Sequence, residues 1–245
     1  FRYAQDQPDV LTDINLQIAP GSMTALIGAS GSGKTTLVRL IARFFDASAG
    51  AVLVGGVDVR HMSSEQLAGQ ISQIFQDSYL FQGSIADNIR IGKPGATDAE
   101  VLEAARQAGV AEIIARLPQG LDTPVGEGGA RLSGGERQRI AIARALVKDA
   151  AILLVDEATA ALDAENQAAI AEALARLRGK RTVIVIAHQL STVAMADRIV
   201  VLDGGVLREQ GAPAALRAQG GLYAHFLAQR QAAKGWRIAS SAAQK

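Results

Sequence analysis

The run GASGSGKT at residues 28–35 constrains this chain more than any other segment. It follows an apolar stretch of strand length, residues 23–27, and leads into a segment with helical character, residues 36–43. Glycines permit positive φ and carry no Cβ, so successive backbone N–H groups can turn inward around a phosphate chain. The helix N-terminus that follows adds unpaired donors and a partial positive charge. This strand–loop–helix unit predicts an α/β fold that binds a nucleotide.

The loop residues have separate expected roles. Lys34 is placed to reach the terminal phosphates, and the Thr35 hydroxyl is placed to bind Mg²⁺. The other residues expected to contact the nucleotide here are Gly28, Ser30, Gly31, Ser32, Gly33 and Thr36. The alternative is a Gly/Ser-rich turn that binds nothing, and the flanking strand and helix favour nucleotide binding.

Composition limits the class of protein. The 245 residues suit one domain, or a domain with a subdomain, and the net charge of +1 comes from charges mixed along the chain, so no basic tract argues for nucleic acid. The chain has no cysteine, which excludes disulfides and thiolate metal sites. No signal peptide is evident, and the longest apolar runs fall short of the roughly 20 residues of a spanning helix. The chain therefore reads as soluble and cytoplasmic, and its first residue, which is not Met, permits a longer parent protein.

The opening of the chain is expected to be antiparallel β-structure. Apolar residues alternate with polar ones over residues 14–18, and Pro20-Gly21 turns the chain into the strand before the loop. The valine-rich runs 52–54 and 57–59 flank Gly55-Gly56, which is a strong hairpin signal. We therefore predict a small antiparallel β subdomain.

The middle of the chain changes to helical character from about residue 77 to residue 148, which predicts an inserted helical subdomain. Within it, the pair Thr97 and Glu100 forms a capping box that opens a helix. Beyond residue 148 short apolar strands alternate with helices, as in a mainly parallel sheet covered on both faces. We expect one domain over residues 1–230 and a poorly ordered tail over residues 231–245.

Polar residues follow several predicted strands. Residues 151–155 end in Asp156 and Glu157, residues 182–187 end in His188, and residues 71–75 end in Gln76. Ligands of parallel sheets bind at the carboxyl ends of strands, so these groups should gather near the loop. For phosphoryl transfer to water, Asp156 suits Mg²⁺ and Glu157 suits the general base. Gln76 can touch the metal or the water, and His188 can donate to the γ-phosphate. Polar capping of strands is the alternative for any one of them.

A second motif, LSGGERQ, lies at residues 132–138. Ser133 and Glu136 form a capping box, which explains part of the motif by helix initiation alone. Gly134 and Gly135 each cost the helix about 1 kcal/mol relative to Ala, and a cap does not need them. A phosphate that approaches the backbone closely does need them.

With both motifs in order, the chain resembles the nucleotide-binding domain of ABC transporters over about residues 1–230. The resemblance implies a P-loop NTPase (RecA-like) core that uses ATP and Mg²⁺. It implies that Ser133, Gly134 and Gly135 engage the γ-phosphate held by the opposite copy in a head-to-tail dimer. It also implies that Asp163 lies in the loop that links the two sites, and that Tyr3 stacks on adenine.

Two further segments resemble the exporter-type subclass. Residues 123–129, TPVGEGG, resemble its TxVGExG segment, and residues 75–89 match the same subclass. The resemblance implies that both segments meet the coupling helices of a membrane domain. For Tyr79, Leu80 and Phe81, core packing is the alternative to an exposed patch for that partner. Gln189 departs from the commoner Arg, and we assign it no effect.

The resemblance therefore predicts an ATPase module that powers a transporter at the cytoplasmic face of the inner membrane. Its second ABC domain is expected to be identical or paralogous. The substrate and the direction of transport lie outside what these residues specify. A soluble ABC ATPase of DNA repair or translation is one alternative, although long coiled-coil insertions and paired cassettes are absent from the sequence. A small-molecule P-loop kinase is the other, although such an enzyme does not need LSGGERQ.

Overall fold

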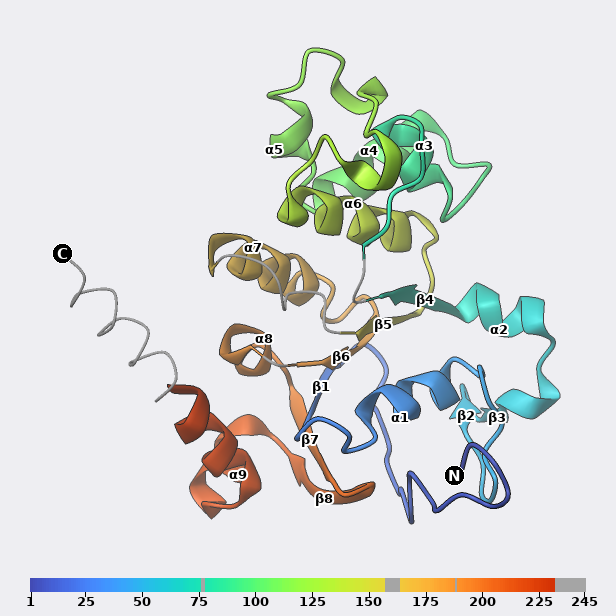
Figure 1. The fold of residues 1–245 in the computed structure, drawn as a ribbon, viewed down its shortest axis with the longest axis vertical. Coiled ribbons are helices and arrows are strands. Elements are labelled where there is room, and N and C mark those ends of the chain that lie inside the picture. Colours follow the sequence, from blue (N-terminus) through green and yellow to red (C-terminus); the bar gives the residue numbers. More distant parts are fainter. Residues whose placement is uncertain (76–77, 157–163, 188, 232–245) are drawn as a thin grey trace.

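A six-stranded sheet forms the centre of this protein, whose computed structural model describes residues 1–75, 78–156, 164–187 and 189–231 (Figure 1). The strand order is β4-β5-β6-β1-β7-β8, with β8 antiparallel to β7 and the other neighbours parallel. The strands are β1 (Met23–Ile27), β4 (Ile71–Ile74), β5 (Ile152–Asp156), β6 (Thr182–Ile186), β7 (Arg198–Asp203) and β8 (Val206–Gly211). The predicted α/β fold with a mainly parallel sheet is confirmed.

Helices cover both faces of the sheet. They are α1 (Lys34–Ile41), α2 (Ser64–Gln70), α3 (Ile85–Arg90), α4 (Asp98–Gln107), α5 (Ala111–Ile114), α6 (Gly134–Val147), α7 (Ala164–Ala175), α8 (Leu190–Ala194) and α9 (Pro213–Gln219), with short 3-10 turns at Val59–His61, Gly120–Asp122 and Glu127–Gly129. Side chains from α1 and α2 share one core cluster with Leu154 of β5. Side chains from α3, α4 and α6 share the other with Leu153 and Val155. Neighbouring residues of one strand thus face opposite helical layers.

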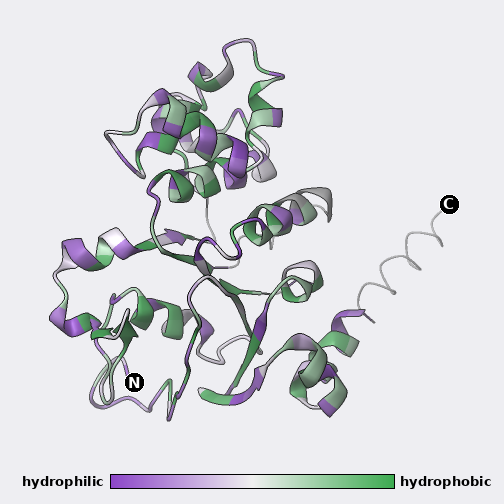
Figure 2. Ribbon diagram, turned by 180° about the vertical axis from the view of Figure 1, so that it is seen from behind, coloured by the Kyte–Doolittle hydropathy of each residue, from purple (hydrophilic) through white to green (hydrophobic). Residues whose placement is uncertain are grey.

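The predicted helical region is present between β4 and β5. Helices α3 and α4 both contact α6, and α3 to α6 lie together at one end of the molecule (Figure 1). The expected capping box at Thr97 starts α4, with Thr97 and Glu100 each accepting a backbone N–H from the other. Figure 2 shows green strands at the centre and helices that carry both colours, as expected for amphipathic helices around a buried sheet. The domain boundaries themselves stay a prediction.

The β subdomain differs from the expectation. The Gly55-Gly56 hairpin is confirmed, since β2 (Leu53–Val54) pairs antiparallel with β3 (Val57–Asp58). Residues 14–18, however, form no strand. Their side chains still alternate between half-buried and exposed, and Ile14 and Leu16 contact the core cluster on the α1 side. The alternation correctly identified the half-buried side chains, but it carries no information on whether a neighbouring strand is available for pairing.

Candidate functional site

The loop between β1 and α1 is shaped by its glycines. Gly28, Gly31 and Gly33 have φ values of 151°, 77° and 97°. A Cβ on Gly28 would lie 2.1 Å from the carbonyl oxygen of Leu202, so this position excludes every larger residue. Gly33 is the N-cap of α1, and no side chain caps this helix start. No side-chain cap therefore competes with a ligand for the backbone donors of the first turn.

Lys34 lies across this loop and is only 6% exposed. Its Nζ donates to the carbonyl oxygens of Gly28 (3.0 Å) and Ala29 (2.7 Å) and to the hydroxyl of Ser32 (3.2 Å). The predicted phosphate-binding residues Ser30 and Gly31 are exposed on the outside of the loop. The described acceptors of the ammonium group are thus neutral, and phosphate oxygens could replace them with stronger charge-assisted hydrogen bonds.

Aromatic residues flank the start of α1. The Tyr3 hydroxyl lies 2.9 Å from the Thr36 hydroxyl, so the chain's N-terminal segment is held beside the loop. The Tyr3 ring meets Phe1 and Phe45 edge to face, with centroids 4.9 and 5.0 Å apart. Tyr3 is 40% exposed and can therefore offer a ring face to a ligand. Phe45 was not among the predicted site residues, because in the sequence it is an ordinary apolar residue after α1.

The carboxyl ends of the parallel strands meet on one edge, as predicted. Asp156 ends β5 opposite Ile186, the last residue of β6, and α1 contacts β5. Asp156 and Thr35 are both half-buried oxygen-bearing residues. The predicted residues Gln76, Glu157, Asp163 and His188 lie outside the described residues.

The second motif starts α6 on the other face of the sheet. Ser133 is the N-cap: its hydroxyl accepts from the Glu136 N–H (3.3 Å), and its own N–H donates to the Glu136 carboxylate (2.8 Å). Arg116 pairs with the same carboxylate at 3.0 Å. Ser133 and Gly134 are exposed, whereas Gly135 is buried. The predicted capping box is therefore present, and this helix start faces solvent in a different layer from α1 (Figure 1).

The comparisons with known proteins agree with these motifs. Residues 11–160, more than half of the chain, match the protein family described as "ABC transporter".

The chain belongs to the ABC transporter family.

Among curated relatives, the ABC domain is 50% identical over 226 residues to an ATP-dependent lipid A-core flippase of Chromobacterium violaceum. It is 49% identical to the cyclolysin secretion/processing ATP-binding protein CyaB of Bordetella pertussis, and 48% identical to the mycobactin import ATP-binding/permease protein IrtB of Mycolicibacterium smegmatis. These alignments cover 92%, 93% and 95% of this chain but 39%, 32% and 40% of those proteins. The ABC domain thus spans about two fifths or less of their length.

A solved structure, "Structure of a bacterial Atm1-family ABC exporter with ATP bound", has the same fold. It aligns with a TM-score of 0.87 at 46% identity, covering 94% of the ABC domain and 40% of that chain. Family membership argues against the small-molecule kinase. No helix in the described ranges combines the length and the apolar character needed to cross a membrane.

The two exporter-type segments lie side by side in the ABC domain. The Val125 N–H donates to the Gly83 carbonyl (2.9 Å), and the Ile85 N–H donates to the Thr123 carbonyl (3.1 Å). Tyr79 and Phe81 are 54% and 53% exposed, with ring centroids 5.2 Å apart. The expectation of an exposed apolar patch is wrong for Leu80, which is fully buried in the core. Exposure therefore alternates along these three residues, and the middle one packs inward.

Proposed function

We propose that this ABC domain binds and hydrolyses ATP and that it is the motor of an exporter-type membrane transporter. The observation that carries the proposal is the loop after β1, where positive-φ glycines lead into an uncapped helix start with Lys34 buried beside it. Such a loop suits a chain of phosphates. The similarity to an exporter solved with ATP bound supports the choice of nucleotide.

The chain's own residues divide the chemistry between them. Lys34 and the loop N–H groups bind the terminal phosphates, and Tyr3 stacks on the adenine ring. Thr35 and Asp156 fit Mg²⁺ because both offer the oxygen ligands that this ion prefers, and α1 contacts the strand that ends in Asp156. When bound, Mg²⁺ supplies charge neutralisation at the phosphates. Gln76, Glu157 and His188 keep their predicted roles at the metal, the attacking water and the γ-phosphate.

A second ABC domain completes the site. Within one chain, the loop before α1 and the start of α6 belong to different layers, so an exposed Ser133 is well placed to serve another copy (Figure 1). In the proposed head-to-tail dimer, Ser133, Gly134 and Gly135 contact the γ-phosphate held by the partner's loop, and Asp163 links the two sites. Dimerisation on ATP binding then supplies the mechanical step.

A membrane domain is the other proposed partner, and it places the ABC domain at the cytoplasmic face of the membrane. The exposed rings of Tyr79 and Phe81, next to residues 123–129, form an apolar surface suited to a partner. The name of the similar mycobactin protein joins ATP-binding and permease parts in one polypeptide, which supports this arrangement.

Light scattering on Glu157→Gln tests the proposal. Without its general base, the variant should bind ATP and not turn it over, so the sandwiched state should accumulate. We expect a monomer without ATP and a dimer with ATP, while the wild type hydrolyses ATP. A wild-type protein that neither binds nor hydrolyses ATP would overturn the proposed function.

A further inference from the structure

Three aromatic rings from two distant segments form a cluster beside the start of α1. The centroid of the Tyr3 ring lies 4.9 Å from that of Phe1 and 5.0 Å from that of Phe45, with interplanar angles of 82° and 85°. Phe1 and Phe45 also contact each other, with centroids 5.9 Å apart. An edge-to-face pair is attractive because the positive edge of one ring meets the negative face of the other. The cluster therefore favours one orientation of the Tyr3 ring.

The segment around Tyr3 is tied to both ends of α1. The Tyr3 hydroxyl lies 2.9 Å from the hydroxyl of Thr36, which is 7% exposed and belongs to the first turn of the helix. Beyond the other end of α1, the Ser48 hydroxyl accepts from the Arg2 N–H at 3.1 Å, and Phe45 contacts the Tyr3 ring. Tyr3 nevertheless stays 40% exposed, so part of its ring is free for a ligand.

Phe45 is joined to α1 by an ordered turn. The Phe44 N–H donates to the Arg39 carbonyl (2.9 Å), and the Arg43 N–H donates to the Leu40 carbonyl (3.1 Å). Arg43 has a φ of 55°, so the chain leaves the helix through a left-handed residue, as in a Schellman motif. The helix that starts at the phosphate loop thus ends in a turn that fixes the place of Phe45.

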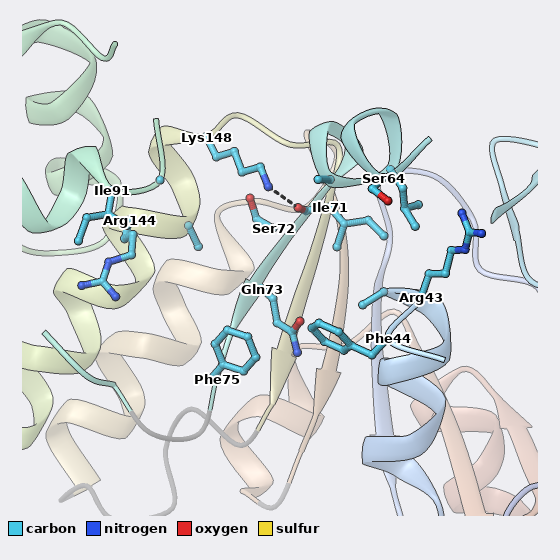
Figure 3. A pocket seen from close by; sticks show the side chains of 15 residues that line it. Arg43, Phe44, Ser64, Ile71, Ser72, Gln73, Phe75, Ile91, Arg144 and Lys148 are labelled. Atoms are coloured by element: carbon cyan, nitrogen blue, oxygen red, sulfur yellow. Dashed lines mark hydrogen bonds between the residues drawn. The ribbon is translucent and has the colours of Figure 1, made fainter. Parts of the chain in front are cut away.

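The neighbouring Phe44 has different surroundings. It lines a groove of about 590 Å³ beside the edge strand β4, together with Arg144 and Lys148 (Figure 3). Phe44 is 55% exposed, and within the described ranges its ring contacts no other aromatic ring. Of these two adjacent phenylalanines, Phe45 alone contacts Tyr3.

We propose that Phe45 is a positioning residue for ATP binding: it holds the Tyr3 ring in the orientation on which adenine stacks, without touching the base itself. The inference rests on the proposed function, which includes the adenine contact of Tyr3, and it adds a residue from beyond the end of α1. A Tyr3 ring that is not held must be ordered when ATP binds. The apparent Kd then rises by the inverse of the fraction of molecules in which the ring is in place.

ATP binding and hydrolysis by the 245-residue chain test the proposal. Phe45→Ala should raise the Kd of ATP about two- to tenfold, the range expected for the loss of an aromatic pair. The effect should appear in KM and not in kcat, because the residues assigned to the terminal phosphates are unchanged. Phe45→Tyr keeps the ring and should retain the wild-type affinity. Phe44→Ala is the matched control and should leave the Kd unchanged.

A second variant separates positioning from direct contact. In a Tyr3→Ala background, Phe45→Ala should change the Kd no further, because the ring that Phe45 positions is absent. A further loss of affinity equal to that in the wild-type background would mean that Phe45 contacts the base, and would overturn the inference.

An unchanged Kd in either single alanine variant would also overturn it, because the three rings would then only pin the N-terminal segment. Melting temperatures check folding, and Phe45→Leu, which keeps apolar bulk without the ring, gives the same readout if Phe45→Ala does not fold. A wild-type chain that does not bind ATP would instead refute the proposed function.

Discussion

The two helix starts that carry the predicted anion-binding motifs are built in different ways. Helix α1 begins after Gly33, in a left-handed conformation, and has no side-chain cap. Helix α6 begins after Ser133, in an extended conformation, and is capped reciprocally by Ser133 and Glu136. The first start keeps its donors for a ligand, whereas the second uses some of its own donors to hold its shape.

The two helix starts also differ in how far they are exposed to solvent. Lys34 is buried against loop carbonyls within one chain, whereas Ser133 and Gly134 face solvent. A binding loop that is organised within the chain should tolerate few changes, because packing and ligand contacts coincide there. A helix start that serves another copy should tolerate changes in the monomer and fail only when two copies meet.

The largest effect is expected for Lys34→Ala. The substitution removes the cation assigned to the terminal phosphates, and the loss of one such stabilising donor typically slows turnover by about 10²–10³-fold. Steady-state ATP hydrolysis measures the effect, with the melting temperature as the folding check. Turnover within about tenfold of wild type would show that the loop does not depend on this residue.

Ser133→Arg should separate ATP binding by the monomer from ATP-driven dimerisation. The monomer should still bind ATP through its own loop, while a bulky cation at the exposed start of α6 should block ATP-driven dimerisation and lower hydrolysis at least about tenfold. Thr97→Arg is the matched control, since it removes the N-cap of a capping box of the same kind at α4. If Ser133→Arg weakens ATP binding by the monomer, the two helix starts are not independent. If both variants lose dimerisation alike, the effect belongs to capping rather than to the signature.

A glycine series compares packing at the two starts. Gly28→Ala puts a Cβ 2.1 Å from the Leu202 carbonyl, whereas at Gly31 nothing lies within 4 Å. Gly28→Ala should therefore lose about 1–3 kcal/mol more folding stability than Gly31→Ala. Gly134→Ala, at an exposed helical position, should gain up to about 1 kcal/mol and still weaken ATP-driven dimerisation. Urea denaturation of the three variants measures this order, and equal losses at Gly28 and Gly31 would contradict it.

Local patterns were sufficient for the parts of the fold that local chemistry determines. The Gly55-Gly56 hairpin and the capping boxes at Thr97 and Ser133 could be predicted because backbone conformation and side-chain caps act within a few residues. The absence of a strand at residues 14–18 could not be predicted, because pairing depends on a partner strand that periodicity does not report.

The candidate site likewise has parts that local sequence predicts and parts that depend on distant residues. The loop and the signature are contiguous in sequence, so their residues could be named in advance. The contact of Tyr3 with Thr36 and the groove around Arg144 and Lys148 join residues far apart in the chain. In sequence Arg144 is an ordinary basic residue of a helix, and only the fold places it over Phe81. Contacts between residues far apart in the chain therefore cannot be read from local sequence patterns.

The smallest expected effect concerns the cap of α6. Burial opposes ionisation of Glu136, but hydrogen bonds from the Ser133 N–H and hydroxyl, with the charges of Arg116 and Arg139, lower its pKa below the ordinary 4.5. A carboxyl group with a lowered folded-state pKa stabilises the protein above its unfolded pKa, and this contribution is lost as the pH falls through the folded pKa. Glu136→Gln keeps a neutral capping acceptor. The free energy of unfolding of the wild type should therefore exceed that of Glu136→Gln by up to about 1 kcal/mol at pH 7. Unfolding measured between pH 7 and pH 3 should show that this difference in unfolding free energy shrinks as the pH falls. A gap that stays constant with pH would mean that the charge does not hold this helix start, and that the hydrogen bond from the Ser133 N–H is sufficient.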